Sequence, residues 1–350
     1  MSKKSQILLS GIQPTGRLHL GNYLGALKNF VDLQNSGKYE CYFFIADLHA
    51  LTENPEAKDL NINIRSLAAD FLAAGLDPKK SVIFQQSQIS LLPELKWILS
   101  TLTPVSELLR MTAFKEKVLQ PLNPPERETI TKEKLDEIIR ESNFGLAEYP
   151  VLMAADILIF GAELIPVGED QLQHLELART LARKFNNKFG KTFKEPRALL
   201  TSAPRVMSLD SPQKKMSKSS PSGCLFIDET TEIILDKIKR AVTDSGSDIK
   251  YNVKEKPAIS NLLLIYSSLS AEPISSLENR FAGKNYAYFK EELAKLIVNH
   301  FADFRTKKAS LVKKPGTLRK ILDAGSKKVN DIAEKTLTDV KRKMGFLLLQ

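Results

Sequence analysis

The chain has 350 residues, of which 43% are apolar and 26% charged, and its formal charge is +10. This composition excludes an intrinsically disordered or fibrous protein, and the length predicts two domains. Only two cysteines occur, Cys41 and Cys224, which excludes a disulfide framework and a four-thiolate zinc site and indicates a reducing compartment. Because no segment has the apolar length of a signal-peptide core or a membrane span, we expect a cytoplasmic protein with no membrane contact.

Strands and helices alternate through the first half of the chain. Short apolar runs predict buried strands at 6–11, 41–46, 82–85 and 164–167. Apolar residues at helical spacing predict helices at 22–34, 60–74, 92–101, 105–118, 151–160 and 170–187. Nearly continuous apolar strands separated by helices indicate an α/β fold, a doubly wound parallel sheet covered on both faces. Binding sites in such sheets lie at the carboxyl ends of the strands.

The rest of the chain predicts an insertion and a helical second domain. Residues 120–142 hold three prolines and charges of both signs, which indicates an exposed insertion with a short helix at 131–141 capped by Thr129 or Thr131. Beyond Pro212 the periodicity is helical, at 229–243, 259–269, 285–303, 316–323 and 327–344. We therefore expect a first domain at 1–220 and a helical domain at 221–350. Residues 301–350 carry 13 basic and five acidic side chains, which suits a polyanionic partner but equally a solvated lysine-rich face.

A glycine-rich turn, GIQPTGRLHLGN, spans residues 11–22 between the first strand and the first helix. Glycines at such a turn let the backbone approach a ligand, and the helix N-terminus offers N–H groups to an anion. The segment is neither a P-loop nor a GxGxxG fingerprint. The polar groups Gln13, Thr15, His19 and Asn22 favour a site, whereas His19 taken alone is more typical of a capping or core-edge histidine.

A second motif, KMSKS, occupies residues 215–219 in a loop between Pro212 and Pro221. Its lysines and hydroxyls suit a mobile phosphate clamp that neutralises a leaving pyrophosphate. A solvated basic loop is the alternative, but a match of all five letters seldom arises by chance, so the motif is a specific signal.

The two motifs resemble the HIGH and KMSKS signatures of class I aminoacyl-tRNA synthetases, in that family's order. GIQPTG, the following NYLGAL, MAAD at 153–156 and VGEDQ at 167–171 resemble the bacterial type of tryptophanyl-tRNA synthetases. The resemblance implies a Rossmann-like catalytic domain followed by a helical tRNA-binding domain. It also implies a homodimeric ligase that activates L-tryptophan with ATP, whose Mg²⁺ the nucleotide carries, and then charges tRNA(Trp).

The resemblance also implies roles for individual residues. It implies an ATP site made by Gln13, Pro14, Thr15, His19, Gly21, Asn22, Gly168, Glu169, Asp170, Val206, Lys215, Met216, Ser217, Lys218 and Ser219. Within or beside it, catalytic roles fall to Lys215, Lys218, Lys117 and Gln13, and no residue is assigned to a protein-held metal. The tryptophan site would hold Asp156, Met153, Tyr149 and Gln171.

Asp156 is the most informative of these residues because it lies in the otherwise apolar segment 152–160. A buried carboxylate needs a partner, and a bond between helices would satisfy it. The resemblance implies instead that Asp156 accepts the indole N–H, the only donor of a tryptophan side chain. Asp47 and His49 end the second strand at the same edge of the sheet, where we expect His49 to have a supporting role at most.

Other functions remain open at this stage. A tyrosyl-tRNA synthetase shares the fold and both signatures, although the Asp156 segment and VGEDQ favour tryptophan. A small-molecule nucleotidyltransferase usually lacks the KMSKS loop, and a non-catalytic tRNA-binding paralogue would not need Lys215 and Lys218. We expect Lys341, Arg342 and Lys343 to contact tRNA unless the tail docks on the body, and Trp97 to lie in a dimer interface or in the core.

Overall fold

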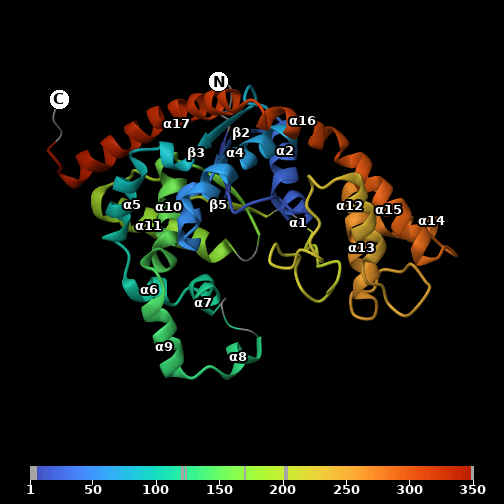
Figure 1. The fold of residues 1–350 in the computed structure, drawn as a ribbon. Helices are drawn as coiled ribbons and strands as arrows, with labels where there is room; N and C mark the ends of the chain where they lie inside the picture. Colours follow the sequence, from blue (N-terminus) through green and yellow to red (C-terminus); the bar gives the residue numbers. More distant parts are fainter. Residues whose placement is uncertain (1–5, 120–121, 123, 169–170, 201–203, 348–350) are drawn as a thin grey trace.

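The computed structural model describes residues 6–119, 122, 124–168, 171–200 and 204–347, and a parallel sheet forms its centre (Figure 1). Its five strands lie in the order β3-β2-β1-β4-β5. The strands are β1 Gln6–Ile12, β2 Tyr39–Ile45, β3 Ser81–Gln85, β4 Leu164–Val167 and β5 Arg197–Leu200. The four strands predicted from the sequence are confirmed, and β5, a four-residue edge strand whose residues are exposed or half-buried, was missed.

Both faces of the sheet are buried, which explains why its strands have so few polar residues. Leu8, Cys41 and Phe43 point into one hydrophobic core, which continues into the helical part of the chain. Leu9 and Tyr42, their neighbours in sequence, point into a second core. Side chains alternate between the faces of a strand, so continuous apolar runs satisfy both cores. The predicted doubly wound α/β fold is therefore confirmed.

Helices connect the strands and cover the sheet. They are α1 Leu20–Asn22, α2 Lys28–Asn35, α3 Asp47–Ala50, α4 Ala57–Ala73, α5 Leu92–Ser100, α6 Val105–Leu109, α7 Thr112–Leu119, α10 Phe144–Ile159 and α11 Leu172–Phe189. Two short 3₁₀ turns, η2 Leu51–Glu53 and η3 Gln86–Gln88, and a π-helical turn, η1 Tyr23–Leu27, complete them. The predicted helix at 105–118 is divided into α6 and α7. The prediction for α10 began too late, because Pro150 lies inside the helix rather than at its entrance.

The predicted insertion extends away from the body of the molecule (Figure 1). Its described residues form α8, Pro124–Thr129, and α9, Lys132–Glu141. The hydroxyl of Thr131 accepts a hydrogen bond from the backbone N–H of Lys134, so Thr131, one of the two predicted caps, begins α9.

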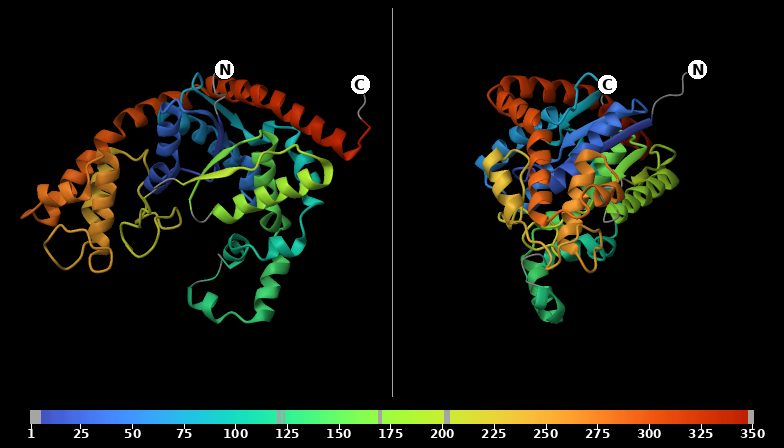
Figure 2. Two further views of the ribbon diagram at one scale, coloured as in Figure 1. Left: turned by 180° about the vertical axis from the view of Figure 1, so that it is seen from behind. Right: turned by 90° about the vertical axis from the view of Figure 1, so that its right-hand side faces the viewer.

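The last part of the chain is helical, as predicted. It contains α12 Thr231–Arg240, α13 Pro257–Ser270, α14 Ile274–Arg280, α15 Tyr286–His300, α16 Ala302–Val312 and α17 Pro315–Met344. The first four form a lobe beside the sheet, and α17 returns across the sheet domain (Figure 2). The two helices predicted at 316–323 and 327–344 are thus one helix.

Helix α17 covers the edge strand β3. At Gly325 a β-carbon would lie 1.9 Å from the carbonyl oxygen of Ile83, so only glycine permits this approach. Lys341 pairs with Glu94 at 2.8 Å, and the ammonium of Lys343 donates to the carbonyl oxygen of Lys191 at 2.6 Å. The basic tail therefore docks on the first domain through two of its lysines, and the boundary placed at residue 220 stays a prediction.

None of the described helices has both the length and the apolar character needed to cross a membrane.

Candidate active site

The glycine-rich turn follows β1 and ends in a reciprocal helix cap. The imidazole Nδ1 of His19 accepts from the backbone N–H of Asn22, and the side-chain oxygen of Asn22 accepts from the backbone N–H of His19, both at 3.3 Å. These bonds fix both side chains at the start of α1. The π-helical turn η1 follows directly, an irregularity that is frequent at functional sites.

His19 is a neutral donor rather than a cation. It is buried, and burial together with the nearby charges of Lys218 and Lys215 lowers its pKa from 6.5 to about 4. Since Nδ1 accepts a hydrogen bond, the ring proton resides on Nε2. His19 can therefore donate to an oxygen of a bound anion without adding a full charge.

The KMSKS loop is anchored at its centre, and its polar side chains remain near the surface. Met216 is buried, and its backbone N–H donates to the carbonyl oxygen of Val206 at 3.0 Å. The ammonium of Lys218 donates to the carbonyl and hydroxyl oxygens of Thr15, at 3.1 and 3.2 Å. Burial lowers the pKa of this lysine. The structure thus brings the two sequence motifs together, with the cation of one against the turn of the other.

Other predicted ATP-site residues lie along these two segments. Pro14 and Val206 are buried, Gly21 and Asn22 are half-buried, and Lys215 is exposed. The hydroxyls of Ser217 and Ser219 bond to each other at 2.9 Å. Gly168 follows β4 directly, whereas Glu169 and Asp170 lie outside the described residues. The ATP-site role assigned to 168–170 stays a prediction.

A cavity of about 220 Å³ opens at the carboxyl ends of β1, β2 and β4. All four predicted tryptophan-site residues line it, and so does Gln13; the four are Tyr149, Met153, Asp156 and Gln171. Gly11 forms part of its wall, where a β-carbon would lie 2.7 Å from the ring of Phe44. The wall is mostly apolar, and Asp156 places a carboxylate in it.

Two neighbours hold the carboxylate of Asp156. The Nε2 of His49 donates to Oδ2 at 3.0 Å, and the amide nitrogen of Gln86 lies 3.0 Å from Oδ1 and 2.8 Å from Oδ2. Burial raises the pKa of Asp156, and the bonds from His49 and Gln86 oppose that shift. A carboxylate has about four lone-pair positions, so these three contacts leave one on Oδ1 for a further donor.

Gln86 fixes this arrangement and was missed from the sequence. Its Oε1 accepts from the backbone N–H groups of Leu48 and His49, at 3.0 and 3.3 Å. This bonding sets the amide orientation, so the NH₂ group must face Asp156. Its position directly after β3, at the sheet edge where sites occur, was the available signal.

His49 and Asp47 differ in what they contact. His49 bonds directly to Asp156, which is consistent with the supporting role expected from the sequence. Asp47 accepts from Gln85 and Ser87 and does not line the cavity. Asp47 therefore joins the ends of β2 and β3.

Tyr149 lines the cavity, and Lys117 lies over the Tyr149 ring. The phenol of Tyr149 bonds to Nε2 of His174 at 2.8 Å, and burial raises its pKa to about 12. The ammonium of Lys117 lies 5.0 Å from the centre of the Tyr149 ring and pairs with Glu53 at 3.0 Å. Lys117 would have to leave Glu53 to reach a phosphate, so its catalytic role stays a prediction.

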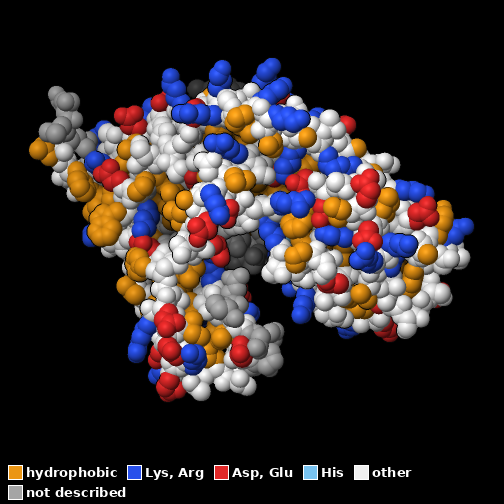
Figure 3. All heavy atoms as spheres, viewed as in Figure 1, with side chains coloured by type: hydrophobic (Ala, Val, Ile, Leu, Met, Phe, Trp, Pro, Cys, Tyr) orange, Lys and Arg blue, Asp and Glu red, His pale blue; other side chains and the backbone are white. Residues whose placement is uncertain are grey.

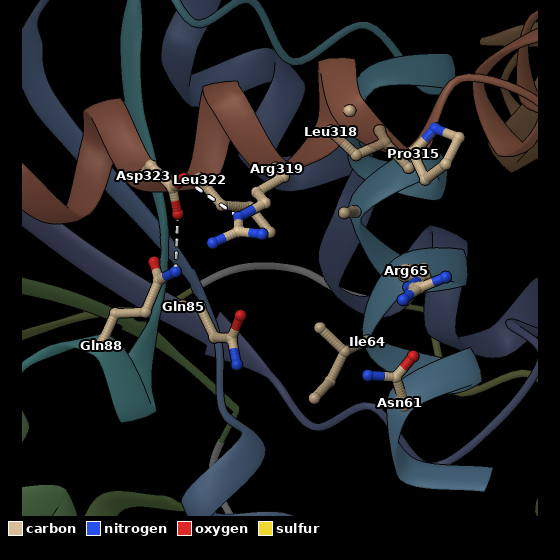
Figure 4. Close-up of a pocket in the computed structure, with 12 residues that line it drawn as sticks. Asn61, Ile64, Arg65, Gln85, Gln88, Pro315, Leu318, Arg319, Leu322 and Asp323 are labelled. Carbon is tan, nitrogen blue, oxygen red and sulfur yellow. Dashed lines mark hydrogen bonds and ion pairs between the residues drawn. The ribbon is translucent and has the colours of Figure 1, made fainter. Parts of the chain in front are cut away.

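A larger cavity, of about 520 Å³, lies between α4 and α17 (Figure 4). Its lining includes Arg65, Arg319 and Gln88, whose amide donates to Asp323 at 2.8 Å, and none of the predicted site residues. Among the side chains that the structure describes, no group of three or more His, Cys, Asp or Glu could hold a metal ion.

An α/β sheet with a glycine-rich turn, a facing lysine loop and an adjacent amino-acid-sized cavity defines a class I synthetase. The family model for class I tRNA synthetases of the W and Y type matches residues 1–302. The chain belongs to this family and is an aminoacyl-tRNA ligase. The Rossmann-like fold followed by helices is confirmed.

Relatives distinguish the tryptophan branch from the tyrosine branch. The chain is 41% identical over 351 residues to the tryptophan–tRNA ligase of Clostridium acetobutylicum, covering 99% of each. The tryptophanyl-tRNA synthetase of Mycoplasma pneumoniae superposes with a TM-score of 0.83 at 32% identity, covering 98% of each chain. The enzyme of Campylobacter jejuni, complexed with ADP and tryptophan, gives 0.80 at 35% identity, over 97% of this chain and all of that one. The tryptophan assignment is confirmed over the tyrosine alternative.

Proposed function

We propose that the chain activates L-tryptophan with ATP, releases pyrophosphate, and transfers the tryptophanyl group to tRNA(Trp), with the residue roles that follow. The observation that carries the amino-acid assignment is the carboxylate of Asp156, held by Gln86 and His49 in an apolar cavity with one acceptor position left. The indole N–H would donate to that position. Phenylalanine would leave it unpaired, at a cost of about 1–3 kcal/mol.

ATP would bind between the glycine-rich turn and the KMSKS loop. The backbone at Gln13–Thr15 and the neutral donor His19 would contact its phosphates, and Lys218 would exchange its bonds to Thr15 for the pyrophosphate. Mg²⁺ would enter with the nucleotide and offset phosphate charge. The tryptophan carboxylate would attack the α-phosphorus, so the protein supplies positioning and charge neutralisation rather than a nucleophile.

Transfer to tRNA would use the helical part of the chain. Basic side chains gather along the top of the molecule in the view of Figure 3, where α17 lies. The exposed lysines on α17 and directly before it are Lys313, Lys314, Lys320, Lys327, Lys328 and Lys335. A row of cations suits the phosphates of a folded RNA. Because Lys341 and Lys343 bond to the first domain, Arg342 is the one of the three predicted tail residues that we still propose to bind RNA.

A homodimer in the cytoplasm is also proposed. Trp97 and Val105 expose 67% and 70% of their surface, and Leu109 exposes 41%. They come from the successive helices α5 and α6, and hydrophobic side chains are exposed on the flank of the molecule where α5 lies (Figure 3). Exposed apolar patches often mark a site of protein contact. Trp97 is therefore proposed for an interface between two copies.

Amino-acid-dependent exchange of pyrophosphate into ATP tests the activation step. We expect exchange with tryptophan at a kcat/KM about 5- to 150-fold above that with phenylalanine, and above that with tyrosine. Exchange with tyrosine alone, or none with any amino acid, would contradict the proposal. Charging of tRNA(Trp) by the same preparation tests the second step.

A further inference from the structure

A lysine of the helical part is buried against the sheet domain. Lys308 lies on α16, which packs along α4, and only 10% of its side chain is exposed. Its ammonium lies 2.7 Å from Oδ1 of Asp70 on α4 and 2.8 Å from Oδ2 of Asp228, which follows the KMSKS loop in the chain. One cation therefore joins three separate segments.

The two carboxylates in this cluster have different surroundings. Asp70 is 1% exposed, and burial raises its pKa to about 6 even though Lys308 opposes the shift. Burial also disfavours the charge of Asp228, but the bonds from Arg17 and Lys308 hold its pKa below the ordinary value. A buried ion pair is weak support for stability, because well-packed apolar residues often replace it at no cost. Stability alone therefore does not explain why a lysine is buried at position 308.

Asp228 connects the cluster to the glycine-rich turn. Its Oδ1 accepts from Nε and Nη2 of Arg17, at 2.9 and 2.6 Å, so the guanidinium is fixed by two bonds. The same guanidinium lies 4.4 Å from the ring centre of Phe226. The backbones run side by side here, since the N–H of Leu20 donates to Leu225 and that of Ile227 to Leu18.

Arg17 lies two residues from Thr15, which accepts the ammonium of Lys218. A continuous set of contacts thus runs from Lys308 through Asp228 and Arg17 to the turn that faces the KMSKS loop. We propose that Lys308 is a positioning residue: it fixes the glycine-rich turn through Asp228 and Arg17, and so couples α16 of the helical part to ATP binding. This inference rests on the proposed function of that turn.

Replacing Lys308 alone would leave Asp70 buried without a cation, so the variant could fail through instability. The test therefore uses the double variant Asp70→Leu/Lys308→Met, which substitutes an apolar pair for the ion pair. The matched control is Lys290→Met, which removes a half-buried lysine of α15 that donates to Lys239 and Ala241 and has no contact with the turn. Thermal unfolding of the full-length proteins checks that all are folded.

Two readouts are measured, the Kd of Mg²⁺–ATP by calorimetry and the KM values for ATP and tryptophan in pyrophosphate exchange. The double variant should unfold close to the wild-type temperature. Its Kd for Mg²⁺–ATP and its KM for ATP should both be about tenfold higher than in the wild type, as expected for the loss of a charged hydrogen bond. The tryptophan KM should stay within twofold, and Lys290→Met should leave all three constants unchanged. Arg17→Met should raise the ATP constants by a similar factor.

Wild-type ATP constants in a folded double variant would overturn the inference, because Lys308 would then serve only to neutralise Asp70. Equal rises in the ATP and tryptophan KM values would also overturn it, since a general loosening of the fold affects both. If the wild type binds ATP but shows no exchange with tryptophan, the proposed function fails while the Kd comparison still decides the role of Lys308. If the wild type does not bind ATP, both fail.

Discussion

Substitution of Asp156 by asparagine probes the amino-acid site with little change in volume. One oxygen becomes an NH₂ group, and the amide nitrogen of Gln86 lies within 3.0 Å of both positions. Either orientation of the new amide therefore sets a donor against a donor. Gln86 cannot turn to accept, because its oxygen is occupied by the backbone N–H groups of Leu48 and His49.

The conflict with Gln86 is present with and without ligand, so it lowers the stability of the variant rather than its kcat/KM. The loss in kcat/KM follows from the indole N–H, which would lose its charged acceptor at a cost of about 1–3 kcal/mol. We expect kcat/KM for tryptophan in pyrophosphate exchange to fall about 5- to 150-fold, a tenfold change for each 1.4 kcal/mol. The KM for ATP should change less than twofold, because the hydrogen bonds of Asp156 go to His49 and Gln86 rather than to either motif.

Asp47→Asn is the matched control. Asp47 is 5% exposed and also accepts from a glutamine amide, yet it does not line the cavity. It should lower stability without changing kcat/KM for tryptophan by more than twofold. A folded Asp156→Asn variant that activates tryptophan within twofold of wild type would refute the reasoning about this carboxylate.

Three further predictions concern the ATP motifs and the tail. Lys218→Ala should lower the exchange kcat about 100-fold or more, whereas Lys214→Ala, on the exposed side of the same loop, should stay within threefold; equal effects would show that only total charge matters. His19 is protonated more readily in the unfolded chain than in the fold, so stability is lost as pH falls from 6.5 towards 4. Measured with denaturant, the free energy of unfolding should fall by about 2 kcal/mol more between pH 7.5 and 5 in the wild type than in His19→Gln. The same pH dependence in both proteins would contradict the lowered pKa of His19. Lys343→Ala should lower the stability by up to about 1 kcal/mol and leave the ratio of tRNA charging to activation unchanged, whereas Arg342→Ala should lower that ratio; the opposite pattern would contradict the docking of the tail.

The strands and most helices could be predicted because burial on both sides of the sheet imposes a long apolar pattern. The two edge strands differ: β3 is buried beneath α17 and was predicted, whereas β5 has only four residues, two of them exposed, and was missed. Two predicted helices proved to be one, α17. Gly325, which lies between them, weakens the local helical signal, but the close contact with the backbone of Ile83 requires a glycine there. Tertiary packing, which a single sequence does not display, decided these cases.

The candidate site was predictable where short motifs carry it and not where distant polar residues complete it. The glycine-rich turn, the KMSKS loop and Asp156 could be selected from the sequence. Gln86 was not selected, because its place after a strand was the only signal and its role depends on two backbone N–H groups that the fold brings to it. Lys308 and Asp70 are more than 200 residues apart, so only the fold brings them together.

The most direct test replaces the ligand's donor and leaves the protein intact. In 3-(benzothiophen-3-yl)alanine a sulfur atom occupies the place of the indole N–H, while the bicyclic shape is retained. Measured by pyrophosphate exchange on the wild-type chain, kcat/KM should be about 5- to 150-fold lower for this analogue than for tryptophan. Equal values for the two amino acids would contradict a hydrogen bond from the indole to Asp156.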